Sequence, residues 1–91
     1  MEKVTVRLPA VLAQMIDGEK RIEVRGDTIG EALNELVRLR PALGVHLFNE
    51  AGTLRRHILC FHNEVYTRGD GLGRPVGPGD TITILNSVSG G

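Results

Sequence analysis

Apolar and polar residues alternate in two short segments near the start of the chain, at residues 4–8 and 21–25. In the first segment valine and leucine positions are separated by threonine and arginine, and Pro9 follows directly. Alternation with a period of two is typical of a strand with one buried face. The two segments are therefore predicted to be strands. Together they predict a hairpin, whose connection through the turn at residues 17–18 is longer than a tight turn.

The hydrophobic period changes at residue 28. Thr28 and Glu31 have the spacing of a capping box, in which each side chain bonds a free backbone N–H of the first helical turn. The apolar residues that follow recur at helical spacing and define one face: Ile29, Ala32, Leu33, Leu36 and Val37. Arg40-Pro41 ends the pattern, because a proline ring pushes the residue before it out of the α region. One well-capped amphipathic helix is predicted between these points.

The middle of the chain is less regular. Residues 42–56 show no sustained period and are predicted to form a short helical turn or an ordered loop, with a turn near residues 49–52. A β-prone run at residues 57–62, the turn residues Asn63-Glu64 and a short run at residues 65–67 then predict two more strands.

The last third of the chain begins with residues 69–80, which hold five glycines and two prolines and are predicted to lack regular structure. Pro78-Gly79 fits the middle of a type II turn that leads into a strand at residues 81–85. The element order is thus β-β-α-β-β-β. One apolar helix face and alternating strands predict an α+β fold, a β-grasp (ubiquitin-like) domain over residues 1–85 in which one main helix packs on a mixed sheet of four to five strands. Residues 86–91 are predicted to be a flexible tail.

The same alternation assigns side chains to the two faces of the sheet. Ile82 and Ile84 are predicted to face the helix, and so are Ile58 and Cys60. The opposite face then carries an apolar cluster beside the tail, predicted to dock a partner: Leu59, Phe61 and Leu85. An exposed apolar cluster usually marks an interface. The inverted assignment, with these three residues in the core, stays open at this point.

Composition narrows the classes of partner. Eleven basic residues balance eleven acidic ones, and the nine arginines are dispersed, with Arg55-Arg56 the only adjacent pair. This distribution argues against nucleic-acid binding. The single cysteine, Cys60, excludes an intrachain disulfide and is best interpreted as a small core residue. Neither a long apolar run nor a signal peptide is present, so no membrane association and a cytoplasmic location are expected.

Several candidate sites lack the features that their chemistry needs. Residues 69–73, GDGLG, have neither the lysine nor the following helix of a phosphate-binding loop. His46, His57 and His62 do not have the spacing of a helical zinc pair, and a strand would place His57 on the face opposite His62. No nucleophile–base set stands out. We therefore expect no catalytic site, no metal site and no bound cofactor in the chain itself.

The chain ends in Gly90-Gly91, directly after the last predicted strand. A terminal glycine carboxylate can enter a slot too narrow for other residues, although a frayed terminus or a cloning scar is the simpler reading. Four segments resemble the MoaD/ThiS family of ubiquitin-like sulfur carriers: residues 26–33 (GDTIGEAL), 61–64 (FHNE), 78–85 (PGDTITIL) and 88–91 (VSGG). Family members often have a proline where Asn86 or Ser87 stands and usually a valine where His62 stands, which weakens assignment to one pathway.

The resemblance implies a role for the tail. A ubiquitin-activating-type adenylyltransferase, using ATP and Mg²⁺ in its own site, would adenylate Gly91, and a persulfide donor protein would convert it to a thiocarboxylate. Val88, Ser89 and Gly90 would thread the tail into the partner's site. The sulfur would go to an acceptor synthase in molybdopterin, cysteine or a related biosynthesis. The alternatives are the small subunit of molybdopterin synthase, a protein modifier that forms isopeptides with lysines, and an adaptor with an inert terminus.

Overall fold

The computed structural model describes residues 3–67 and 69–86. Five strands form one sheet: β1 (Lys3–Arg7), β2 (Arg21–Arg25), β3 (Ile58–His62), β4 (Val65–Thr67) and β5 (Thr81–Asn86). The α-helices are α1 (Ala10–Ala13), α2 (Ile29–Leu39) and α3 (Gly44–Leu47). Short 3₁₀ helices are η1 (Gln14–Ile16), η2 (Pro41–Leu43) and η3 (Gly69–Gly73). Each predicted strand is present to within one residue at either end, and the predicted main helix is α2.

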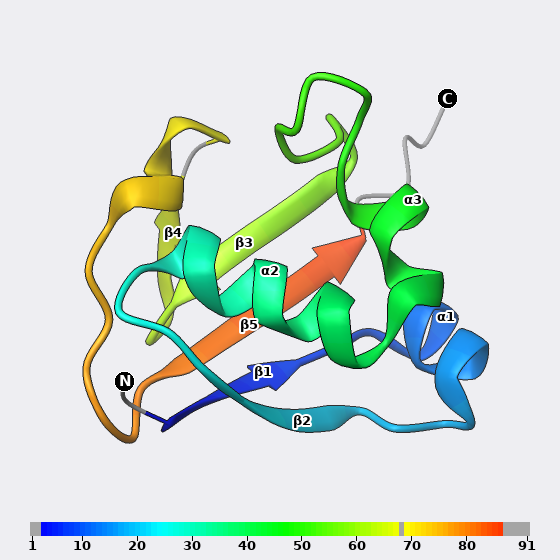
Figure 1. The fold of residues 1–91 in the computed structure, drawn as a ribbon, viewed down its shortest axis with the longest axis horizontal. Helices are drawn as coiled ribbons and strands as arrows, with labels where there is room; N and C mark the ends of the chain where they lie inside the picture. The colour runs from blue at the N-terminus through cyan, green and yellow to red at the C-terminus, as the bar shows by residue number, and fades with distance from the viewer. Residues whose placement is uncertain (1–2, 68, 87–91) are drawn as a thin grey trace.

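The sheet has the strand order β2-β1-β5-β3-β4. β1 and β5 run parallel, with Val6 opposite Ile82, and the other neighbouring strands are antiparallel. The sheet is therefore mixed, as predicted, and the first and last strands of the chain lie side by side at its centre. Figure 1 shows α2 lying across one face of this sheet.

The connection between β1 and β2 contains α1 and η1, neither of which was predicted. The N–H of Ala13 donates to the carbonyl of Pro9 at 2.9 Å, so the proline stands at the helix start, where its missing N–H costs nothing. The chain turns back toward β2 at Asp17 and Gly18, whose φ angles of 61° and 81° lie in the left-handed region. The predicted turn at residues 17–18 is thus confirmed, but two short helical segments lie between it and β1.

The capping box of α2 is present with one difference from its expected form. The N–H of Glu31 donates to Oγ1 of Thr28 at 3.1 Å, as predicted. The carboxylate of Glu31 accepts from the N–H of Asp27 at 2.9 Å, one residue before the cap. At the other end Arg40 leaves the α region, with φ −135° and ψ 78°, immediately before Pro41.

Two segments without a sustained hydrophobic period contain short helices, as predicted for residues 42–56 but not for residues 69–80. Within residues 42–56, η2 continues into α3, and the turn at residues 49–52 is closed by Asn49, whose side-chain oxygen accepts from Ala51 N at 2.9 Å. The prediction that residues 69–80 lack regular structure is wrong for residues 69–73, which form η3. The reason is Leu72, which packs against the core beside α2. It lies so close to that helix that a Cβ added to Gly30 would come within 3.0 Å of the Leu72 carbonyl oxygen.

The core lies between the sheet and α2. The side chains predicted to face the helix are buried there, including Ile82, Ile84, Ile58 and Cys60. From α2 itself, Ile29, Ala32, Leu33 and Leu36 are fully buried, while Val37 is half-buried and packs against them. Burial raises the pKa of the Cys60 thiol, which fits its predicted place in the core. No helix among the described residues is long and apolar enough to cross a membrane.

Candidate docking site

The face of the sheet opposite α2 carries no helix among the described residues (Figure 1). Its side chains come from the alternate positions of each strand, which the burial patterns leave exposed or half-buried. We call this the outer face. It holds the three side chains predicted to dock a partner, so the inverted face assignment is wrong.

Apolar side chains gather on the outer face where β3, β4 and β5 adjoin. Leu59 lies directly opposite Leu85 in the β3–β5 ladder, and Phe61 lies opposite Tyr66 in the β3–β4 ladder. Leu85 is 42% exposed and Tyr66 51%, whereas Leu59 and Phe61 are half-buried. The rings of Phe61 and Tyr66 are 5.5 Å apart and tilted by 53°. We refer to the four residues Leu59, Phe61, Tyr66 and Leu85 as the apolar patch.

Tyr66 is the member of the apolar patch that sequence reasoning missed. The signal was available, because a two-residue hairpin turn at Asn63 and Glu64 places residue 66 opposite residue 61. Tyr66 therefore shares a face with Phe61 by register alone.

A groove runs along the outer face beside β5. One part, of about 290 Å³, is lined by Arg7, Asn63, Glu64, Thr81 and Thr83. A second part, of about 340 Å³, is lined by Arg7, Phe61, Glu64, Thr83 and Leu85. The two parts share three residues, so the groove is continuous from the start of β5 to the apolar patch.

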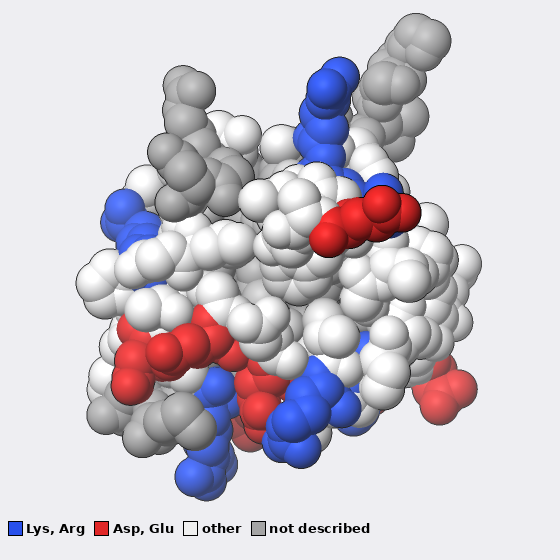
Figure 2. All heavy atoms as spheres, turned by 45° about the horizontal axis from the view of Figure 1, so that its top comes forward, with Lys and Arg blue, Asp and Glu red and all other residues white. Residues whose placement is uncertain are grey.

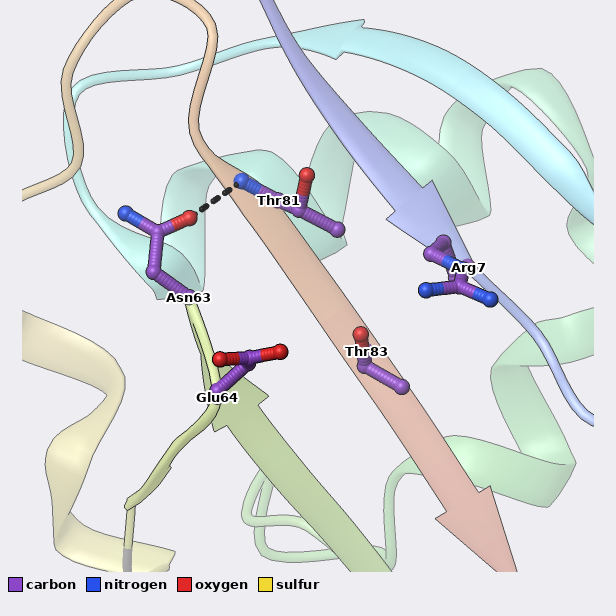
Figure 3. A pocket seen from close by; sticks show the side chains of 5 residues that line it. All are labelled: Arg7, Asn63, Glu64, Thr81 and Thr83. Atoms are coloured by element: carbon purple, nitrogen blue, oxygen red, sulfur yellow. Dashed lines mark hydrogen bonds between the residues drawn. The ribbon is translucent and has the colours of Figure 1, made fainter.

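Figure 3 shows how the polar half of this groove is built. Arg7 on β1 and Glu64 in the β3–β4 turn lie on opposite sides of β5, with Thr83 between them. The side-chain oxygen of Asn63 accepts from Thr81 N at 2.8 Å, which ties the turn to the start of β5. The groove therefore has a cationic wall, an anionic wall and a hydroxyl-bearing floor.

A hydrogen-bonded chain of side chains lies at the start of β5. Nε2 of His62 is 2.7 Å from Oδ2 of Asp80, and Nε of Arg74 donates to Nδ1 of His62 at 2.8 Å. Because Nδ1 accepts, the neutral imidazole carries its proton on Nε2 and donates it to Asp80. The N–H of Gly77 and the side chains of His62 and Asn63 bond the Asp80 carboxylate and lower its pKa to about 2.

These hydrogen bonds give His62, one of the three histidines considered as metal ligands, a structural role. Both nitrogens of His62 are engaged by protein groups, and its neighbour Cys60 is buried. Residues 3–67 and 69–86 contain no group of three or more potential ligands placed to hold a metal ion.

The tail residues predicted to act, Val88, Ser89, Gly90 and Gly91, lie outside the described residues. Asn86, the last described residue, pairs with Ile58 at the end of β5. The preceding pair in this ladder is Leu85 with Leu59. The chain therefore leaves the sheet next to the apolar patch.

Comparisons with known proteins place the chain among small carrier and modifier proteins. The model of the ThiS family matches residues 6–91. The sulfur carrier protein CysO of Mycobacterium tuberculosis is 31% identical over 97% of this chain and 98% of its own length. Small archaeal modifier protein 1 of Haloferax volcanii is 38% identical over 78% of this chain and 79% of its own length.

A solved structure agrees with the sequence comparisons. A chain of the Amycolatopsis orientalis BexX/CysO complex superposes with a TM-score of 0.86 and 35% identity, covering 97% of this chain and 99% of that one. The predicted β-grasp, ubiquitin-like fold is thereby confirmed.

Proposed function

Because this chain belongs to the ThiS family, we propose that it is a sulfur carrier, a protein cosubstrate without a catalytic site of its own, whose Gly91 is activated and then carries sulfur. The observation that carries this proposal is the extent of the family match, which runs to the terminal glycine. The similarity to CysO over nearly the full length of both chains supports the same function.

The proposed chemistry takes place in partner proteins. In the site of a ubiquitin-activating-type enzyme, with ATP and Mg²⁺, the Gly91 carboxylate attacks the α-phosphate, releases pyrophosphate and becomes an acyl adenylate. The terminal sulfur of a donor persulfide then attacks the acyl carbon and displaces AMP. A thiol cleaves the resulting acyl disulfide, which leaves the thiocarboxylate on Gly91 and a disulfide on the donor side.

The folded domain contributes presentation. The outer face offers a surface that a partner can bind, and β5 leads from that surface to the tail. We propose that the apolar patch docks on the activating enzyme while Val88, Ser89 and Gly90 thread into its site. Glycine at position 90 would fit a narrow passage, because any Cβ there would take up room in it. A relative solved in the BexX/CysO complex supports the idea that proteins of this kind work bound to a partner.

Protein modification is the second candidate function. The relative named small archaeal modifier protein 1 favours it, because that protein is 38% identical to this chain. Both functions begin with the same adenylate and differ in the final acceptor, which is sulfur for a carrier and a lysine amine for a modifier. A small subunit of molybdopterin synthase would use the same thiocarboxylate, with its tail inserted in a larger subunit.

The decisive experiment is the intact mass of the protein purified from its own source. A sulfur carrier shows a species heavier by the difference between one sulfur and one oxygen atom, and this species loses its added mass after alkaline hydrolysis. Ladders of higher-mass conjugates linked through Gly91 would instead identify a modifier. A protein found only as the free carboxylate, and not adenylated by the activating enzyme with ATP, would contradict both functions and leave an adaptor with an inert terminus.

A further inference from the structure

The outer face of β1 and β2 carries apposed positive charges. Arg7 lies directly opposite Arg21 in the antiparallel ladder, and Lys3 lies directly opposite Arg25. All four side chains are exposed. Glu23, opposite Thr5, is the acidic residue of this part of the face. We call Lys3, Arg7, Arg21 and Arg25 the cationic strip.

This arrangement is unfavourable in the isolated protein. Like charges directly opposite one another destabilise an antiparallel pair of strands. Two arginines elsewhere in the chain are paired with acids: Arg38 bonds Glu35 and Arg40 bonds Glu19, each at 2.6 Å. Among the described residues, no ion pair involves a member of the cationic strip. Although the chain has no net charge, the outer face of β1 and β2 carries four cations and one acid.

The two apposed pairs are not equivalent. Glu35 of α2 has a lowered pKa, caused mainly by its hydrogen bond from Arg38 and to a small extent by the charge of Arg25. Arg25 is thus partly balanced from the helix layer, whereas Arg7 and Arg21 have no such partner among the described residues. On the side of the molecule seen in Figure 2, most Lys and Arg side chains lie beside Asp or Glu, around a broad uncharged area.

The cationic strip is continuous with the apolar patch. Arg7 lines both parts of the groove, and the second part also contains Phe61 and Leu85. A partner bound to the apolar patch therefore also lies close to Arg7. It lies close to Arg21 as well, because Arg21 is opposite Arg7 on the next strand. Glu64 closes the far wall of the groove with a negative charge, so the surface is cationic on the side of β1 only (Figure 3).

From this geometry we propose that the cationic strip, centred on Arg7 and Arg21, binds an acidic surface of the activating enzyme next to the site that receives the apolar patch. The inference rests on the proposed function, because it takes that enzyme as the partner. The two regions would act differently. Exposed charges of one sign steer a complementary partner and raise the association rate, while the buried apolar contact sets the dissociation rate.

An acidic protein surface suits the strip better than nucleic acid does. Affinity for a phosphate backbone comes mainly from several Lys and Arg side chains that neutralise successive phosphates. Here the cations border an apolar patch and a groove whose opposite wall is a carboxylate. This combination matches a protein interface with an apolar centre and a charged rim.

The test compares association and dissociation rates with the activating enzyme from the same organism, by stopped flow at several salt concentrations. The double variant Arg7→Glu, Arg21→Glu should associate roughly tenfold or more slowly than the parent at about 20 mM salt. This difference should nearly disappear at about 0.5 M salt, where charges are screened within a few ångströms. Its dissociation rate should change far less. Phe61→Ala should show the opposite pattern, with faster dissociation and little change in association.

Arg38→Glu is the control matched to the single variant Arg7→Glu, because each reverses the charge of one exposed arginine, and Arg38 lies on α2, on the other side of the sheet. The inference is overturned if Arg38→Glu slows association as much as Arg7→Glu does, or if the parent's association rate does not depend on salt. It is also overturned if the parent does not bind the enzyme, or if a labelled RNA binds the parent and is lost in the double variant. The intact-mass measurement judges the sulfur-carrier function independently of all these results.

Discussion

Asn63 and Glu64 both have positive φ angles, 48° and 75°, in the turn between β3 and β4. Two successive left-handed residues are what a two-residue type I′ hairpin requires. Asparagine adopts this conformation readily, whereas a left-handed glutamate costs about 1 kcal/mol. The strained residue borders the groove, and its turn also sets the register that pairs Phe61 with Tyr66. One turn therefore positions both the anionic wall and the aromatic pair.

At the same scale, Phe61 is the side chain whose loss should separate binding from stability. Phe61→Ala removes the contact with Tyr66 on the outer face and leaves the core intact, so the melting temperature should change by only a few degrees. Affinity for the activating enzyme should fall by roughly tenfold or more, as expected for an aromatic anchor. Leu85→Arg should weaken binding in the same way. Calorimetry and titration measure both quantities.

Val65→Ala is the control for these variants, because Val65 is also apolar and 50% exposed but lies opposite His62. It should leave affinity unchanged. Global unfolding of Phe61→Ala or Leu85→Arg would contradict the face assignment, and unchanged affinity in both would remove the apolar patch from the mechanism.

Gly91 is the residue whose carboxylate the proposed chemistry uses. Adding a single alanine after Gly91 should leave the melting temperature unchanged, since the addition lies beyond β5, and should abolish formation of the adenylate. Pyrophosphate release from ATP measures this step. Gly90→Ala is the companion variant, because it keeps the carboxylate and should slow the reaction through the added methyl group. Adenylation of the extended protein without prior trimming would show that the terminal carboxylate is not the reacting group.

At the scale of elements, the segment between η3 and β5 is held to the rest of the fold by side chains. Arg74, His62 and Asp80 form one hydrogen-bonded chain, and Pro75 forms a bridge with Thr28 just before α2. The turn at Pro78-Gly79 has the predicted features, with φ 82° at Gly79 and a bond from Asp80 N to Gly77 O at 3.1 Å. The start of β5 is thereby positioned against both the helix and β3.

The low pKa of Asp80 predicts how stability depends on pH. Its pKa falls from 3.8 to about 2 on folding, so at pH values between these the unfolded state binds the proton more readily. The stabilisation is complete above the unfolded value and is lost as the pH falls toward 2. Urea unfolding at pH 6 and at about pH 2.5 should therefore show a smaller loss of stability in Asp80→Asn than in the parent.

Asp80→Asn should also have a lower unfolding midpoint than the parent at pH 6, because it weakens the bonds from Gly77 and His62. Glu50→Gln makes the same kind of change at an exposed acid and should follow the parent at both pH values. Equal pH sensitivity of Asp80→Asn and the parent would remove Asp80 from the account of acid stability.

At the scale of the whole molecule, the two faces of the sheet have different tasks. The inner face and α2 form the core, and the outer face is the surface that we propose binds a partner. β5 contributes to the outer face and is followed directly in the sequence by the tail residues. Activation should therefore need the folded domain as well as the terminal glycine.

A peptide with the sequence of residues 82–91 tests this requirement. It carries the same terminal carboxylate without the outer face, so its kcat/KM for adenylation should be at least ~100-fold lower than that of the protein, which corresponds to about 2.8 kcal/mol. Pyrophosphate release measures both substrates under the same conditions. A peptide that reacts as well as the protein would show that the tail alone is recognised.

Most of the elements could be predicted because their evidence is local. The alternation at residues 21–25, the capping box at Thr28 and the turn at Asn63-Glu64 each depend on residues within a few positions of one another. Helices α1 and η1 could not be predicted in this way, because four and three residues are too short to show a helical period. Helix η3 forms because Leu72 packs against the core beside α2, and its glycine-rich sequence alone indicates a loop.

The sequence by itself determined the element order, the apolar face of the main helix and which side chains of β3 and β5 share a face, because hydrophobic period is a property of each segment alone. It left open which of those two faces lies in the core, which burial in the structure decided. Tertiary structure decided what meets on the outer face. Arg7 opposite Arg21, Arg7 facing Glu64 across β5 and Tyr66 against Phe61 all depend on strand order and register. Those are settled only when residues far apart in the chain pack together, since pairing one residue earlier or later would turn each side chain to the other face.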